Sequence, residues 1–108
     1  MTTTTKPPKI LRDDLESKLQ ARIVKWLRAQ GCKVIKYEQN ATTRAGTPDL
    51  LFLKEGFWGV IEVKKTAKSP KRPGQEEWVK WAQENSWGAF VWDSNWLEIQ
   101  KELEELLK

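Results

Sequence analysis

Three residues of this 108-residue chain are best placed to do chemistry. They are an aspartate at the start of one apolar run, and a glutamate and a lysine at the end of the next. Asp49 opens the first run, Glu62 and Lys64 close the second, and the break between the runs falls at Glu55 and Gly56. Two apolar runs around a short break that contains glycine predict a β-hairpin. With an even-length loop centred on this break, Asp49 lies directly opposite Glu62, with Cβ atoms about 5 Å apart. An odd loop would put the two carboxylates on opposite faces.

Glu62 and Lys64 share a face of the hairpin, because side chains repeat every two residues along a strand. Both runs are apolar on both faces, and such strands are usually buried on both. Carboxylates in that setting must be paired or must hold a metal ion. The hairpin alone therefore leaves two interpretations open, a metal site or a plain ion pair at a strand end.

Two carboxylates, a nearby backbone carbonyl and waters make a site for Mg²⁺ or Mn²⁺. Such an ion lowers the pKa of a bound water and neutralises charge on a phosphate. Lys64 would then orient or deprotonate the water, or stabilise the transition state. The chemistry predicted by this interpretation is metal-dependent phosphodiester hydrolysis.

The absence of histidine removes several classes of site. Zinc sites of the C₂H₂ type, HNH-type metal nucleases, Ser-His-Asp triads and histidine-dependent phosphodiesterases all need that residue. If this chain cleaves phosphodiesters, it must use carboxylates, lysine and a hard metal ion. The one cysteine, Cys32, provides no disulfide framework and is expected to pack as a small hydrophobe.

The length suits one compact domain. We expect residues 1–10 to form a disordered N-terminal tail and residues 11–108 to form a single domain. The tail has no apolar core and is unlike a signal peptide. No apolar run approaches the ~20 residues that a membrane span needs. We therefore expect a cytoplasmic protein without membrane contact.

Apolar periodicity and turn residues predict seven elements in the order α-β-β-β-α-β-α. They are a helix from an N-cap at Asp13 to a C-cap at Gly31, strands over 32–37, 49–53 and 57–63, a helix over 75–84, a strand over 87–92 and a last helix over 96–107. This order predicts an α/β fold, a single mixed β-sheet flanked by helices.

Seven tryptophans are unusual in a chain of this length. DNA bases can stack on tryptophan. Most of these tryptophans fall on apolar stripes, however, where they would fill a small core. We expect Trp26, Trp78 and Trp92 to belong to the core, and we leave open the places of Trp87 and Trp96, which flank the last strand.

A basic segment follows the hairpin directly and contains Lys65, Lys68, Lys71 and Arg72 with no acidic residue among them. A polar, turn-rich segment before the hairpin carries Arg44. In a chain with a net charge of +4, these residues suit a polyphosphate substrate and are the candidates for DNA contact. The alternatives are a solvated loop and, for Arg44, an ordinary surface position.

The same residues carry a resemblance to a known superfamily. Pro48-Asp49 followed, after a short hairpin, by Glu62-Val63-Lys64 resembles the PD-(D/E)xK nucleases. Gly46, an upstream helix with Glu16 and a downstream helix with Gln75 make the chain most similar to one branch, the VRR-Nuc (virus-type replication-repair nuclease) domain. The resemblance covers about residues 16–91.

The resemblance implies a PD-(D/E)xK core in which Asp49, Glu62 and the Val63 carbonyl hold Mg²⁺ or Mn²⁺, and Lys64 acts on the attacking water. It also implies that Glu16 and Gln75 belong to the catalytic site. Their alternatives stay open, a helix-capping residue for Glu16 and an ordinary first-turn residue for Gln75. The chain departs from the family pattern at 72–74, where related domains often have a small hydroxyl residue and this chain has Arg-Pro-Gly.

The function implied by the resemblance is a DNA endonuclease without organic cofactor, specific for branched DNA such as four-way junctions. Two symmetric cuts need two sites, so a homodimer is expected. The setting implied is a bacterial or phage-infected cell. Two rivals remain, a nuclease that acts on linear or flap DNA and a non-catalytic nucleic-acid-binding module.

Overall fold

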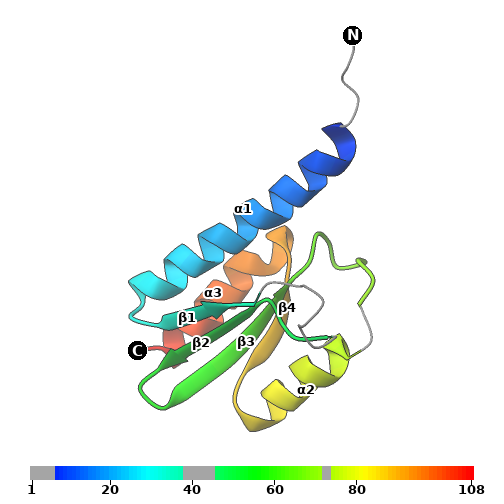
Figure 1. Ribbon diagram of the computed structural model, residues 1–108. Coiled ribbons are helices and arrows are strands. Elements are labelled where there is room, and N and C mark those ends of the chain that lie inside the picture. Colours follow the sequence, from blue (N-terminus) through cyan, green and yellow to red (C-terminus); the bar gives the residue numbers. More distant parts are fainter. Residues whose placement is uncertain (1–6, 38–45, 72–73) are drawn as a thin grey trace.

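The computed structural model describes residues 7–37, 46–71 and 74–108, with side chains described from residue 15 onward. Its elements are α1 Pro7–Ala29, β1 Lys33–Lys36, β2 Leu50–Lys54, β3 Phe57–Val63, α2 Gln75–Asn85, β4 Gly88–Val91, a 3₁₀ turn η1 Asp93–Asn95 and α3 Trp96–Leu106. The strands form one sheet in the order β1-β2-β3-β4 (Figure 1). The predicted α-β-β-β-α-β-α order and the α/β class are thereby confirmed.

The hairpin of β2 and β3 has the register that the sequence predicts. Its two turn residues, Glu55 and Gly56, have φ angles of 41° and 85°. Two successive positive φ angles are the mark of a two-residue type I′ turn, whose twist matches that of the strands. The strands pair from Lys54 opposite Phe57 to Leu50 opposite Ile61. One further step along this register brings residue 49 beside residue 62.

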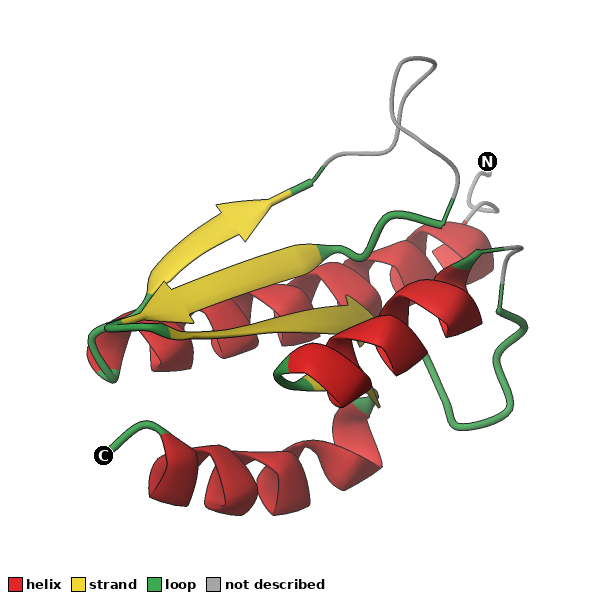
Figure 2. Cartoon of the chain, turned by 90° about the horizontal axis from the view of Figure 1, so that it is seen from below, coloured by secondary structure: helices red, strands yellow, loops and turns green. Residues whose placement is uncertain are grey.

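The sheet is mixed because β4 pairs parallel with β3, whereas β1 and β2 pair antiparallel with their neighbours. The parallel connection runs through α2, which Figure 2 shows lying against one side of the sheet. The helix packs Val79 and Ala82 over β3 and β4, and Gly88 makes the close approach possible. A Cβ atom at Gly88 would lie 2.9 Å from the Ala82 Cβ atom.

The main core lies on the other face of the sheet, between the strands and the helices α1 and α3. Its buried members include Leu50, Phe52, Ile61 and Val63 from the sheet, Leu19, Ile23 and Leu27 from α1, and Leu103 and Leu107 at the end of the chain. Trp26 of α1 meets Trp96 of α3 edge to face, with ring centroids 5.6 Å apart. Gly59 leaves room for the Phe52 ring, since a Cβ atom there would lie 2.4 Å from the ring.

The expectation of strands buried on both faces holds for β3 and is wrong for β2. Val60 and Glu62, on the α2 face of β3, are buried. Leu51 is half-buried and Leu53 is 39 % exposed, because α2 contacts β3 and β4 and leaves the second face of β2 uncovered. Trp78, expected in the core, is exposed for the same reason, whereas Trp87 and Trp96 are buried.

The first helix begins earlier than predicted. Helix α1 starts at Pro7, so Asp13 lies inside the helix and does not cap it. The expected tail of residues 1–10 overlaps the helix at residues 7–10, and residues 1–6 lie outside the described residues. Cys32 is buried, as predicted. Among the described residues, no helix has the length and apolar character needed to cross a membrane.

Candidate active site

The backbone of the hairpin end holds Asp49 and Glu62 against each other. The Asp49 backbone N–H donates to Glu62 Oε1 at 3.1 Å, and the Val63 backbone N–H donates to Asp49 Oδ2 at 2.9 Å. Each carboxylate thus accepts a hydrogen bond from a backbone N–H on the opposite side of the hairpin, just beyond the last paired residues of the two strands. These bonds fix the two carboxylates side by side, as the predicted register requires.

Gln75 joins Glu62 to Lys64. Its side-chain Nε2 donates to Glu62 Oε2 at 2.7 Å, and its Oε1 accepts from Lys64 Nζ at 2.8 Å. Lys64 Nζ also lies 3.6 Å from Glu62 Oε2. All three side chains are buried, and Gln75 is only 1 % exposed. An ordinary first-turn residue would point to solvent, so the position of Gln75 favours the site interpretation.

Lys64 connects the site to the segment that follows β3. Its Nζ donates to the Pro70 carbonyl at 3.1 Å, and its backbone N–H donates to the Val91 carbonyl at 2.8 Å. The Lys64 ammonium thus donates hydrogen bonds to Gln75 and Pro70 and forms an ion pair with Glu62. The position of the Lys64 ammonium is therefore determined by packing and hydrogen bonds together.

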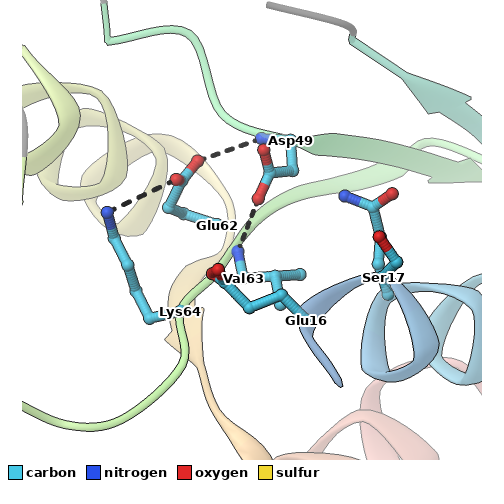
Figure 3. Close-up of a pocket in the computed structure, with 7 residues that line it drawn as sticks. Glu16, Ser17, Asp49, Glu62, Val63 and Lys64 are labelled. Atoms are coloured by element: carbon cyan, nitrogen blue, oxygen red, sulfur yellow. Dashed lines mark hydrogen bonds and ion pairs between the residues drawn. The ribbon is translucent and has the colours of Figure 1, made fainter. Parts of the chain in front are cut away.

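The side chains of Asp49, Glu62 and Lys64 line a cavity of about 270 Å³. Its lining consists of Asp49, Glu62, Val63 and Lys64 from the hairpin and Glu16, Ser17 and Gln20 from α1. Figure 3 shows Glu16 extending from α1 toward the hairpin end, while the Lys64 side chain points toward Glu62. Glu16 thus lies at the site, half-buried, although the sequence left its role open. Ser17 was not predicted, because nothing distinguishes it from other polar helix residues.

The cavity is negatively charged, since three of its lining residues are carboxylates and one is a lysine. Within the described residues, no group of three His, Cys, Asp or Glu side chains is arranged to hold a metal ion by itself. Mg²⁺ does not need such a group, because it is usually bound by one or two carboxylates together with waters and substrate phosphates. Asp49, Glu62 and a backbone carbonyl are oxygen donors of that kind, and they fit such an ion.

The described basic candidates lie on the exposed segment after β3. Lys65, Lys68 and Lys71 are all exposed, and Lys71 Nζ lies 4.9 Å from the centroid of the Phe90 ring. Hydrogen bonds between Thr66 and Ser69 give this segment a defined turn, with the Thr66 N–H donating to Ser69 Oγ at 3.0 Å. Arg44 and Arg72, the other two candidates, lie outside the described residues.

Comparison of the chain with family models, with curated proteins and with solved structures gives no match. The observations that bear on function are therefore the geometry of the site, the chemistry of its residues and the motif that they form.

Proposed function

We propose that this protein is an endonuclease that hydrolyses phosphodiester bonds in DNA and depends on Mg²⁺ or Mn²⁺. One observation carries the proposal: hydrogen bonds join the half-buried Asp49 to the buried Glu62, Gln75 and Lys64, and Asp49, Glu62 and Lys64 line a negatively charged cavity. Burying charged groups costs free energy even when they are paired. Natural proteins usually accept such a cost at functional sites.

Asp49 and Glu62 would hold the metal ion, together with the Val63 carbonyl. The bound ion would supply a water of lowered pKa and offset charge on the phosphate. Gln75 and the Asp49 backbone N–H occupy opposite oxygens of Glu62 and keep this carboxylate in one orientation. Preorganised ligands of this kind need no rearrangement when the substrate arrives.

Lys64 and Glu16 both line the cavity and have separate tasks in this proposal. The Lys64 ammonium, held by Gln75 and Pro70, stabilises negative charge on the phosphate or orients the attacking water. Glu16 accepts a hydrogen bond from that water on the α1 side. The exposed Lys65, Lys68 and Lys71 lie on the segment that follows Lys64 and would contact the DNA backbone.

The resemblance to VRR-Nuc domains narrows the proposed substrate to branched DNA, with the four-way junction as the first candidate. Two symmetric cuts in such a junction would come from a homodimer. This part of the proposal depends on the resemblance rather than on the geometry.

The test is cleavage of end-labelled four-way junction, flap and linear duplex DNA of matched sequence. Each substrate is incubated with Mg²⁺, with Mn²⁺ and with EDTA. We expect metal-dependent cutting, with the junction cut fastest. Cutting of linear or flap DNA alone would keep the chemistry and discard the junction preference. Metal-independent binding without cutting of any substrate would replace the nuclease with a binding module.

A further inference from the structure

A second cavity, of about 420 Å³, adjoins the candidate active site. We call it the α1 groove. It is lined by Leu15, Glu16, Lys18, Leu19 and Arg22 from α1, by Lys64, Lys65 and Thr66 after β3, and by Asp93. The two cavities share Glu16 and Lys64 among their lining residues, so they meet at these two residues. The volume falls within the roughly 300–1,000 Å³ that ligand sites usually have.

The two cavities have opposite charge. The active-site cavity has three carboxylates and one lysine, whereas the α1 groove has four basic side chains and two carboxylates. Lys18, Arg22 and Lys65 are exposed and can meet a ligand from solvent. The active-site cavity would therefore attract a cation, and the neighbouring α1 groove would attract a polyanion. A phosphodiester chain that crosses the boundary at Glu16 and Lys64 would satisfy both.

The interior of the α1 groove differs from a surface built only for phosphates. Its lining also includes two leucines, Leu15, which is 56 % exposed, and the buried Leu19. Paired bases in a duplex are stacked and offer no apolar face to such a surface. An unpaired base can lie against apolar side chains, and leucine is among the residues that contact unstacked bases in other DNA-binding proteins.

We propose that the α1 groove binds an unpaired nucleotide of the substrate strand next to the phosphate that is cut. Arg22 and Lys65 contact its phosphate, and its base lies over Leu15. This inference rests on the proposed function, because it identifies a DNA feature that the same site would recognise. Gapped and flapped DNA have such nucleotides and continuous duplex does not, whereas a four-way junction presents them only when base pairs at its branch point open.

Arg22 now pairs with Asp93, with 3.4 Å between Arg22 Nη1 and Asp93 Oδ1. Both side chains are well exposed, at 57 % and 77 %, so water and salt weaken the pair. A DNA phosphate can therefore replace Asp93 as the partner of Arg22. Removing Asp93 breaks the same ion pair as removing Arg22 but leaves Arg22 available to DNA. A comparison of the two variants therefore separates a DNA-binding role of Arg22 from a structural role.

The test uses fluorescence anisotropy with two labelled duplexes of the same sequence, one continuous and one with a central gap of unpaired nucleotides. Binding is measured in Ca²⁺ without Mg²⁺ or Mn²⁺, over a range of salt concentrations. We expect Arg22→Ala to weaken binding of the gapped DNA about tenfold and to lower the salt slope by about one, as loss of a phosphate contact does. Asp93→Ala is expected to bind as tightly as the unmodified protein or more tightly.

Arg28→Ala is the matched control for Arg22→Ala, because Arg28 is an exposed arginine in the last turn of the same helix. It should bind gapped DNA within twofold of the unmodified protein. Leu15→Ser should remove the preference for gapped over continuous DNA, and Leu97→Ser, at a leucine of α3 that is 64 % exposed, should keep it. Equal effects of Arg22→Ala and Arg28→Ala, or an unchanged preference in Leu15→Ser, would overturn the inference.

The inference and the proposed function fail differently. A protein that cuts DNA normally, but in which Arg22→Ala behaves like Arg28→Ala, keeps the nuclease and loses the nucleotide site. A protein that binds gapped DNA through Arg22 but cuts nothing keeps the nucleotide site and loses the nuclease. A protein that binds neither DNA would contradict both.

Discussion

Replacing Gln75 by Met is expected to lower the free energy of unfolding by about 3 kcal/mol. Gln75 is 1 % exposed and makes two hydrogen bonds to charged groups, at 2.7 Å to Glu62 and 2.8 Å to Lys64. Each bond of this type contributes roughly 1.5–3 kcal/mol. The total loss is smaller than the sum of the two bonds, because Glu62 still accepts from the Asp49 N–H and Lys64 still donates to the Pro70 carbonyl. Met preserves the volume, so the lost hydrogen bonds dominate the change.

The measurement is equilibrium unfolding in urea, followed by tryptophan fluorescence and far-UV circular dichroism. Gln83→Met is the matched control on the same helix, because Gln83 is exposed and makes one hydrogen bond, at 3.2 Å to the Gly88 carbonyl. We expect this control to lose less than about 1 kcal/mol, as for an ordinary neutral bond. Equal losses in the two variants would refute the argument that Gln75 is a central part of the buried site.

Three further predictions concern the fold. Gly59→Ala should cost about 1–3 kcal/mol in urea unfolding, since its Cβ atom would meet the buried Phe52 ring; an unchanged midpoint would show that the ring moves freely. Gly56→Ala should cost only about 1–2 kcal/mol, from its φ of 85°, because nothing lies within 4 Å of the new atom. Burial raises the pKa of the Cys32 thiol above its ordinary 9.0, against a smaller opposing effect of Lys54. The stabilisation from the buried neutral Cys32 thiol is therefore fully present below pH 9 and is lost as the pH rises through the folded-state pKa. Thiol-reagent labelling at pH 8 should be slow until urea unfolds the chain, and fast labelling of the native protein would contradict this.

The hairpin and the position of its carboxylates could be predicted because both depend on local rules. A two-residue turn and strict alternation determine which residues face each other, so Asp49 and Glu62 follow from the place of the break at Glu55 and Gly56. The element order also followed from local signals, namely apolar periodicity and turn residues. Gln75 was named from the resemblance, and only the structure reveals its hydrogen bonds to Glu62 and Lys64.

The parts that were missed depend on packing between segments distant in the sequence. Trp78 lies on an apolar stripe of α2, but α2 covers only part of the sheet, so this side chain remains exposed. The Pro70 carbonyl has no sequence signal as a partner of Lys64, because any backbone carbonyl could accept that bond. The α1 groove likewise exists only where α1 meets the segment after β3. The early start of α1 was missed because Asp13 resembles an N-cap.

The most direct test of the central claim is the single-turnover rate of junction cleavage by Asp49→Asn in saturating Mn²⁺. The asparagine oxygen can still accept the Val63 N–H bond, so the variant should fold while losing a metal-binding charge. Glu98→Gln, at an exposed carboxylate of α3, is the control. A catalytic role for the Asp49 carboxylate predicts a loss of at least about a hundredfold for Asp49→Asn and almost none for Glu98→Gln. Cleavage by a folded Asp49→Asn protein at the rate of the unmodified protein would contradict it.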